Sequence, residues 1–309
     1  MMGIAWPENK AFAFSIFDDT DSQTLQSGKP VYSLLAEYGF RTTKSVWPIL
    51  GRETSPDHGM TCQSPDYLAW AQGLQSQGFE IGYHMATSHT SERSDTLRAL
   101  DQFAQYFGHD PVTMANHYFC EENIYFGDRR VSGANRLIYN LLTGFRNRGR
   151  SRGHMVNDPL FWGDLCRSRL KYVRNFTFAE INTLKACPFM PYHDPERPYV
   201  NLWFASSEGK EVRAFNQRLS EAQQDQLESE GGACIMYTHF GLGFCDDGLV
   251  DARFQSLMQR LSRRNGWFVP VSTLLDYILS VRGPSVISPE NRRKLERKWL
   301  LHKVRHRTT

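Results

Sequence analysis

Residues 11–17 are Ala11-Phe12-Ala13-Phe14-Ser15-Ile16-Phe17, and Asp18-Asp19-Thr20-Asp21 follow them directly. Seven uncharged, mostly apolar residues predict a buried strand. In α/β folds, ligands and chemistry lie at the carboxyl ends of the strands, where these three carboxylates stand. Like charges this close repel one another, so a cation or a shared proton is the natural way to hold them. A solvated acidic turn is the alternative for such a motif taken alone.

Strand-like and helix-like stretches alternate along the rest of the chain. Apolar runs predict further strands at 42–50, 79–83, 112–115, 171–173, 199–205, 233–237 and 267–270. Capped or amphipathic segments predict helices at 30–38, 65–77, 91–107, 137–145, 220–230, 249–261 and 271–281. Repeated strand–helix units imply a parallel sheet, and their number predicts a deformed, TIM-like (β/α) barrel of seven or eight units over residues 1–285.

Several predicted strands end in ionisable residues, which are Asp18 and Asp19, His84, His117 and His239. This is the pattern expected at the catalytic face of a barrel. His84 and His89 are five positions apart, a spacing that suits a loop curling around a centre. Two imidazoles and one carboxylate, with positions open for water and substrate, suit Zn²⁺ and also Co²⁺, Mn²⁺ or Fe²⁺. A single histidine is more often structural, and the prediction of a metal site depends on the whole set.

Three motifs occur in the order known from one family of enzymes. They are Phe17-Asp18-Asp19, then Gly78-Phe79-Glu80-Ile81-Gly82-Tyr83-His84 with His89, and finally Tyr237-Thr238-His239. Over about residues 11–280, the chain resembles the polysaccharide deacetylases of carbohydrate esterase family 4, as a divergent member. The resemblance implies a metal-dependent hydrolase that removes an acetyl group, more often N-acetyl than O-acetyl, from a carbohydrate or glycan precursor.

The resemblance also implies residue roles. Asp18 looks like the general base and His239 like the general acid. Asp19, His84 and His89 look like the metal ligands, with Zn²⁺ the expected metal. Asp21 has no counterpart in the family pattern and is a possible competitor of Asp19 for the metal.

The family's arginine-proline motif is absent from the sequence, and Ala115-Asn116-His117-Tyr118 stands in its place. Asn116 and His117 are therefore candidates for substrate contact, and His117 is also a possible substitute ligand or a structural histidine. Trp162 is a loose match to the family's tryptophan-aspartate motif. Tyr192 and His193 lie in an aromatic, turn-rich segment that suits stacking on sugar rings, with a rigid surface loop as the alternative.

The charge of the chain is concentrated at its C-terminal end. Residues 290–309 hold eight Lys and Arg against two Glu, a local charge of +6, which leaves −3 for the rest of a chain with net charge +3. A near-neutral body argues against a nucleic-acid-binding domain. The segment 286–309 is predicted to be a basic amphipathic tail, which either lies on an anionic membrane surface or docks on the barrel.

The location of the protein is predicted from its first residues and its cysteines. Residues 1–8 lack the basic and apolar regions of a signal peptide, and no apolar run approaches the ~18 residues of a membrane span. Six scattered cysteines without a C-x-x-C pair are typical of reduced thiols in the cytoplasm. We therefore expect a cytoplasmic enzyme, possible membrane contact being confined to the tail.

Two alternatives of other classes stay open at this point. One is a deacetylase-like protein that binds glycans without turnover, since two family motifs are missing. The other is a glycoside hydrolase that uses Asp18 and another carboxylate without a metal. Loss of activity on chelation would separate the second from a metal-dependent deacetylase.

Overall fold

The computed structural model describes residues 4–52, 58–306 and 308 of the 309-residue chain. The predictions for residues 1–8 and for the tail fall in part, at 1–3, 307 and 309, outside these residues. The strand expected at 11–17 is β1 (Phe12–Asp18), and all seven of its residues are buried. β1 is therefore buried on both faces, and other strands of the sheet pair with it on both sides.

Seven parallel strands close into a barrel in the described part of the chain, which confirms the predicted fold. Their order is β1, β2 (Thr43–Val46), β3 (Glu80–Tyr83), β4 (Thr113–Met114), β5 (Tyr172–Phe178), β7 (Leu202–Glu208) and β8 (Ala233–Thr238), which pairs again with β1. The remaining strands lie beside this ring. They are β11 (Gly266–Phe268) on β1, β6 (Tyr192–His193) antiparallel to β7, β12 (Ser285–Val286) on β6, and the hairpin of β9 (Cys245–Asp246) and β10 (Leu249–Val250).

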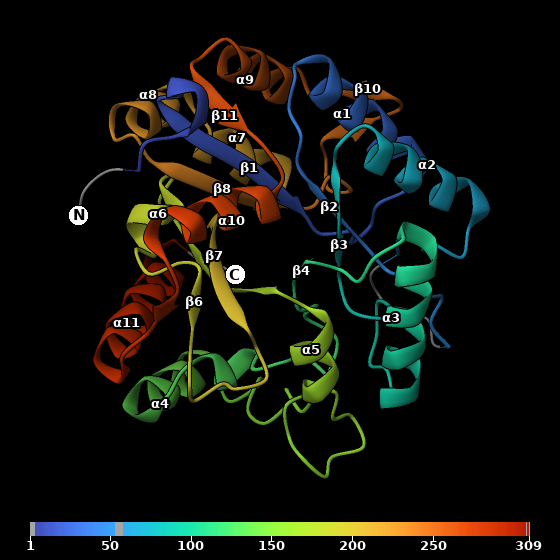
Figure 1. The fold of residues 1–309 in the computed structure, drawn as a ribbon, viewed down its shortest axis with the longest axis vertical. Coiled ribbons are helices and arrows are strands. Elements are labelled where there is room, and N and C mark those ends of the chain that lie inside the picture. Colours follow the sequence, from blue (N-terminus) through green and yellow to red (C-terminus); the bar gives the residue numbers. More distant parts are fainter. Residues whose placement is uncertain (1–3, 53–57, 307, 309) are drawn as a thin grey trace.

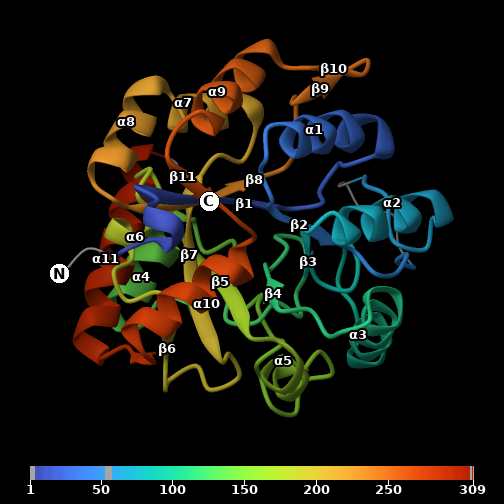
Figure 2. The same ribbon diagram turned by 45° about the horizontal axis from the view of Figure 1, so that its top comes forward.

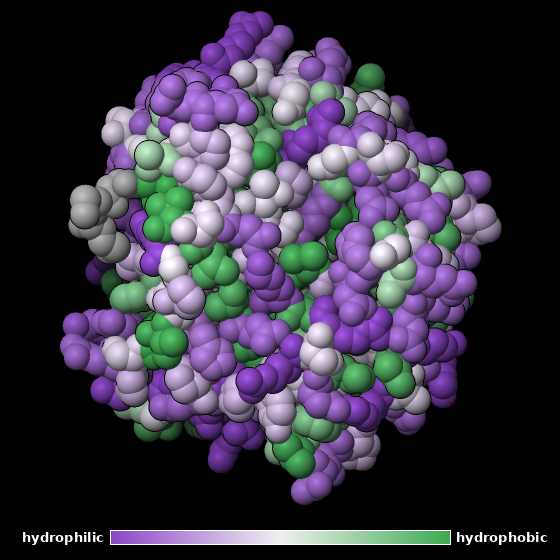
Figure 3. Space-filling view, viewed as in Figure 1, coloured by the Kyte–Doolittle hydropathy of each residue, from purple (hydrophilic) through white to green (hydrophobic). Residues whose placement is uncertain are grey.

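Helices surround the strands on the outside, as Figures 1 and 2 show. They are α1 (Leu25–Glu37), α2 (Pro65–Ser76), α3 (Arg93–Phe107), α4 (Gly133–Leu142), α5 (Gly163–Arg169), α6 (Thr183–Ala186), α7 (Val212–Arg218), α8 (Glu221–Ser229), α9 (Ala252–Ser262), α10 (Val271–Arg282) and α11 (Pro289–His306), with short 3₁₀ turns η1 (Pro7–Asn9) and η2 (Gly127–Arg130). The face seen in Figure 3 is mostly hydrophilic, and its apolar residues form small separate groups.

The first helix begins earlier than the sequence pattern predicts. The expected start at Pro30 is wrong, because α1 begins at Leu25 with Thr24 as a side-chain cap for the amide of Ser27. Pro30 therefore lies inside the helix and cannot donate to the carbonyl of Gln26. The thiol of Cys245 lies 3.6 Å from that oxygen and offers it a replacement donor.

The basic tail folds as α11 and packs on the barrel. Leu295, Trp299 and Leu300 are buried, and the Trp299 ring stacks on Tyr139 of α4 at 5.6 Å between centroids. Glu296, fully buried, accepts a hydrogen bond of 2.8 Å from the Asn135 amide. The docked alternative is therefore the observed one, and Leu295, Trp299 and Leu300 are occupied by contacts within the protein.

Two further predictions concern membranes and thiols. Within the described residues, no helix has the length and apolar character that crossing a bilayer requires. All six cysteines are free thiols, and all but Cys245 are buried.

Candidate metal centre and active site

The predicted ionisable strand ends meet at one face of the barrel. β1 ends at Asp18, and the chain continues through Asp19 to Asp21, while His84, His117 and His239 follow β3, β4 and β8. Because parallel strands share one carboxyl edge, residues far apart in sequence converge there. Asp19, Asp21 and the three histidines line a cavity of about 200 Å³ that is partly open to solvent. This is below the ~300–1,000 Å³ of a drug-sized site, so the cavity suits one small group of a substrate.

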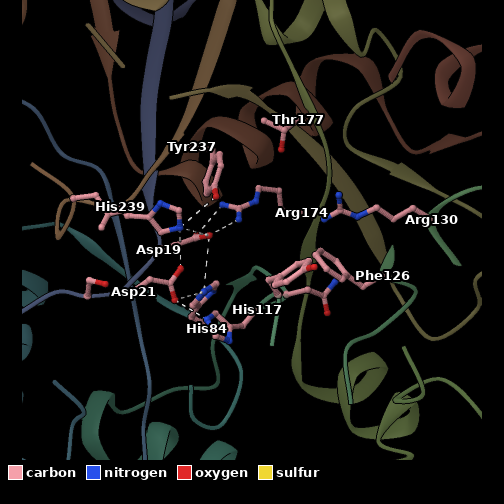
Figure 4. Close-up of a pocket in the computed structure, with 14 residues that line it drawn as sticks. Asp19, Asp21, His84, His117, Phe126, Arg130, Arg174, Thr177, Tyr237 and His239 are labelled. Atoms are coloured by element: carbon pink, nitrogen blue, oxygen red, sulfur yellow. Dashed lines mark hydrogen bonds and ion pairs between the residues drawn. The ribbon is translucent and has the colours of Figure 1, made fainter. Parts of the chain in front are cut away.

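Asp21 is the carboxylate at the centre of this face. Its Oδ1 lies 2.9 Å from Nε2 of His117 and 3.4 Å from Nε2 of His84, and its Oδ2 lies 2.8 Å from Nε2 of His239. Figure 4 shows Asp21 between these three imidazoles. Burial would raise the pKa of the Asp21 carboxyl, but the imidazoles of His84 and His117 hold that pKa well below its usual range.

The donor set of Asp21, His84 and His117 fits a divalent metal. One ligand atom from each of the three buried residues lies within 4.8 Å of the others. Both ring nitrogens of His84 are buried without a hydrogen bond to any described residue, and such groups are costly unless something binds them. Ligand atoms around a tetrahedral Zn²⁺ stand about 3.4 Å apart at bond lengths near 2.1 Å, and the His84–Asp21 separation is 3.4 Å.

Trp47 packs beneath the two imidazoles and sets their orientation. Its ring is stacked on His84 at 6.2 Å between centroids and meets His117 edge-on at 5.6 Å. Trp47 is buried in the loop that follows β2. A large rigid ring in contact with both histidines restricts the positions of their Nε2 atoms.

The structure places His89, one of the expected metal ligands, away from this group. Met85, directly after His84, has left-handed backbone (φ 65°) and turns the chain aside. The Nδ1 atom of His89 lies 2.9 Å from the carbonyl of Thr90, and its ring packs so closely on Gly51 that a Cβ there would lie 1.9 Å from Nε2. The described structure brings Asp21 and His117 to His84 as one candidate ligand group and Asp19 and Asp21 to His239 as a second, and neither group includes His89.

Asp19 lines the same cavity but is held by an arginine. Both of its oxygens accept hydrogen bonds from Arg174 of β5, at 2.8 and 2.5 Å. The guanidinium of Arg174 is sandwiched by the rings of Phe17 and Tyr237, with its carbon 5.1 and 4.3 Å from the ring centres. Asp19 Oδ2 still lies 3.9 Å from Nε2 of His84, so the carboxylate stands within one water of the metal ligands.

Asp18, the expected general base, lies below the cavity and does not line it in the described structure. Its oxygens accept hydrogen bonds from the backbone amide of Phe240 at 2.8 Å and from Gln23 and Tyr32 at 2.9 Å each. The ammonium of Lys44 is 3.8 Å away, and both side chains are fully buried. Burial raises the pKa of Asp18 in spite of these partners. These contacts indicate that Asp18 has a structural role, in which it joins the residues that donate to it.

His239 presents one ring nitrogen to the site. Its Nδ1 lies 2.6 Å from the carbonyl of Lys210 and therefore carries the proton donated there. Its Nε2 faces Asp21 and lies 3.3 Å from the hydroxyl of Tyr237. Burial lowers the pKa of His239, but the hydrogen bond and charge of Asp21 outweigh burial and raise the pKa to about 9. Nε2 is thus the ring nitrogen that His239 presents to groups in the cavity.

The candidate substrate residues divide into two groups. Asn116 and His117 line the cavity, although the amide of Asn116 is engaged on both sides with the backbone of Ile124, at 2.8 and 3.1 Å. Trp162 is buried and donates to the carbonyl of Glu122, the Tyr192 hydroxyl lies 3.4 Å from Asn175, and His193 contacts the carbonyl of Asn201. These last three are not among the residues that line the described cavity.

Sequence reasoning missed Trp47, Arg174, Arg130 and Tyr237 as parts of this site. Arg174 carried a usable signal, because a charged residue inside the run Tyr172–Phe178 must have a partner if the strand is buried. The sequence alone left undecided whether His117 is a metal ligand. Its meeting with Asp21 depends on how the loops after β1 and β4 approach each other in space.

Comparison with known proteins agrees with the architecture. No protein-family model and no curated protein matches the sequence. A structure from Mycobacterium smegmatis, assigned by name to the polysaccharide deacetylases, superposes with a TM-score of 0.52 at 12% identity, covering 93% of this chain and 97% of its own. The chain has the polysaccharide-deacetylase fold.

Two other solved structures are similar to a comparable degree. One from Pseudomonas aeruginosa PAO1, also assigned by name to the polysaccharide deacetylases, gives a TM-score of 0.52 at 12% identity over 91% of this chain and 95% of its own. The allantoinase PuuE gives 0.50 at 12% identity over the same shares. Because structures of different names share this deacetylase fold, the substrate must be argued from the site.

Proposed function

We propose that this protein is a metal-dependent hydrolase that removes an acetyl group, N-acetyl rather than O-acetyl, from a carbohydrate or glycan precursor. The observation that carries the proposal is that one cavity holds a metal-ligand set, a carboxylate and a further imidazole. The metal-ligand set is Asp21, His84 and His117. The carboxylate is Asp19 and the further imidazole is His239. The polysaccharide-deacetylase fold supports the class of reaction.

In the proposed mechanism, Asp21, His84 and His117 would hold the metal, with Zn²⁺ expected for two imidazoles and a carboxylate and Co²⁺, Mn²⁺ or Fe²⁺ as substitutes. The bound metal supplies positive charge that polarises an amide carbonyl and makes a water more acidic. Asp19 accepts a proton from the attacking water as the new carbon–oxygen bond forms. His239 gives its Nε2 proton to the nitrogen as the carbon–nitrogen bond breaks, leaving acetate and an amine.

The assignment of the base moves from Asp18 to Asp19 for a geometric reason. A general base must come within hydrogen-bond reach of the water, directly or through one other water. Asp19 lines the cavity, while Asp18 is fully buried beneath it with its oxygens engaged by three donors. Arg174 then acts as a positioning residue that orients the Asp19 carboxylate.

A metal-independent glycoside hydrolase fits the site less well. That chemistry needs one carboxylic acid with a raised pKa across the scissile bond from a second carboxylate. Asp18, the carboxyl whose pKa burial raises, does not line the cavity. Among the carboxylates that do, Asp21 has a pKa well below the usual range, and Asp19 is paired with Arg174. A protein that binds glycan without turnover stays an alternative that acetate release decides.

We place the reaction in the cytoplasm as part of glycan biosynthesis. The free thiols, five of them buried, support a reducing compartment. We further propose that the substrate is a carbohydrate and that the protein has no nucleic-acid partner.

The test joins metal analysis with acetate release. The purified protein is expected to contain about one equivalent of divalent metal and to release acetate from N-acetylated sugars. Chelation should abolish the release, and added Zn²⁺ or Co²⁺ should restore it. Activity that survives full removal of metal would overturn the proposal in favour of a glycoside-hydrolase-like mechanism, and bound metal without any release would favour a binding protein.

A further inference from the structure

Arg130 is a buried cation that the proposed reaction does not use. It is the last residue of η2 and lines the catalytic cavity together with Asp19, Asp21 and Arg174. Only 9% of its surface is exposed. Its guanidinium carbon lies 4.0 Å from the ring centre of Phe126, and the ring of Trp299 lies 5.5 Å away. Two aromatic faces thus hold the planar group in place.

Arg130 differs from the other buried arginines of the described chain. Arg174 is paired with Asp19, Arg197 and Arg292 both pair with Asp194, and Arg292 also pairs with Glu196. No ion pair among the described residues includes Arg130. Burial, with the like charge of Arg174, lowers the pKa of Arg130 to about 10, so the side chain is still charged at neutral pH. A buried charge without a partner is costly, and such groups persist where a ligand completes them.

The charges in the cavity also favour a bound anion near Arg130. The carboxylates Asp19 and Asp21 balance the guanidiniums Arg130 and Arg174 before any charge on His239 is counted, so a divalent metal at Asp21 would leave an excess of positive charge. Figure 4 shows Arg130 on the side of the pocket away from His239 and Asp21, with its guanidinium directed toward Arg174, whose own guanidinium lies beside Asp19. The like charge of Arg174 disfavours the charge of Arg130, and an anion bound beside Arg130 would relieve this repulsion.

We propose that Arg130 binds an oxyanion, a carboxylate or a phosphate, carried by the same sugar as the acetyl group, so that the enzyme acts on an acidic acetylated sugar. This inference rests on the proposed deacetylase function and adds the substrate class. The planar guanidinium, with its faces covered by aromatic rings, offers its N–H edge for hydrogen bonds that an oxyanion accepts in pairs. A neutral hydroxyl would leave the charge of Arg130 uncompensated.

The experiment compares three acetylated sugars that differ at one position. N-acetylglucosamine, its 6-carboxylate and its 6-phosphate are assayed for acetate release with the metal-loaded protein. A charged hydrogen bond in a buried site predicts kcat/KM about 10- to 100-fold higher for one or both acidic sugars than for the neutral one. The better of the two acidic sugars identifies the oxyanion as carboxylate or phosphate.

Variants then test whether the preference comes from Arg130. Arg130→Gln is expected to collapse the ratio of acidic to neutral kcat/KM toward one, and Arg130→Lys to retain part of it. Arg263→Gln, an exposed arginine at the end of α9, is the matched control and should leave the ratio unchanged. A melting temperature within a few degrees of the parent shows that each variant folds.

Calorimetry of the chelated protein gives a readout independent of turnover. Glucuronate should bind the parent more tightly than glucose, and Arg130→Gln should remove the difference. Glucose 6-phosphate is titrated in the same way. Equal binding of glucose, glucuronate and glucose 6-phosphate, or an acidic preference that survives Arg130→Gln, overturns the inference. Absence of acetate release from all three sugars instead overturns the proposed function, and it does not affect the binding comparison.

Discussion

Asp18 accepts a hydrogen bond of 2.8 Å from the backbone amide of Phe240, the residue that follows His239. The bond joins the carboxyl end of β1 to the loop after β8, across the closure of the barrel. Two adjacent aspartates therefore have separate tasks. Asp18 lies inward and fixes the loop that carries the proposed acid, while Asp19 lies in the cavity beside the candidate metal ligands.

Removal of the Asp18 carboxylate should destabilise the fold. Asp18→Ala leaves the buried Lys44 ammonium without its partner and three donors unsatisfied, which predicts a loss of about 3–5 kcal/mol in the free energy of unfolding. Urea denaturation followed by circular dichroism measures it. Asp66→Ala, at an exposed position in α2, is the control expected to change stability by about 0.5 kcal/mol or less. A similar loss in both variants would contradict the structural role.

The ligand assignment predicts different results for two histidines. His117→Gln should lower the bound metal to well below one equivalent, because it removes an imidazole that lies 2.9 Å from Asp21. His89→Gln should keep the metal, since the described structure places that ring against Gly51. Metal content after dialysis, read by atomic emission, checks both. Retention of metal in His117→Gln together with loss in His89→Gln would restore the ligand set implied by the family motif.

Substitution of Arg174 should lower kcat without a comparable loss of bound metal. In Arg174→Met the Asp19 carboxylate loses both of its hydrogen bonds from β5, and misplacement of the proposed base predicts a fall in kcat of about 100-fold. The metal content should stay near one equivalent, because no candidate ligand changes. Arg174→Lys, which keeps the charge, should recover part of kcat. An unchanged kcat in Arg174→Met would exclude Asp19 as the base that Arg174 positions.

His154 should make the folded protein less stable at low pH. Its ring lies 4.2 Å from that of Tyr125 and its Nδ1 accepts the amide of Tyr125. Burial, with the nearby arginines, lowers its pKa to about 4. Between pH 6.5 and 4 the unfolded chain binds a proton that the folded chain does not, so folding stability decreases as the pH falls through this range.

The His154 effect can be measured by unfolding at several pH values. The shift from 6.5 to about 4 corresponds to at most about 3 kcal/mol. His154→Gln should show a shallower loss of stability than the parent between pH 6.5 and 4. Parallel pH profiles for the two proteins would mean that His154 does not contribute.

The packing of α11 predicts a large effect of its tryptophan. Trp299 is fully buried between α4 and β5, and Trp299→Ala should cost about 3–5 kcal/mol of unfolding free energy. Leu301→Ala, on the exposed side of the same helix, should change stability by about 0.5 kcal/mol or less. Equal effects would indicate that the helix does not dock on the barrel.

The sequence by itself determined the barrel and the edge at which the chemistry gathers. Apolar runs alternating with amphipathic segments specify parallel strands with covering helices, because each must bury its apolar face. The acidic end of β1 and the histidines after β3, β4 and β8 follow from that order, since parallel strands share one carboxyl edge. These features depend on local pattern, so they can be read from neighbouring residues.

Only the tertiary structure decided which side chains meet. Asp18 turns to Phe240, Asp19 to Arg174, and Asp21 to His84 and His117, while His89 turns toward Gly51. These contacts join residues up to 222 positions apart, and they depend on how the loops leave the barrel and on the rings, such as Trp47, that pack beneath them. A motif gives the order of acidic and imidazole groups, but the direction of each side chain is set by the packing of the whole barrel.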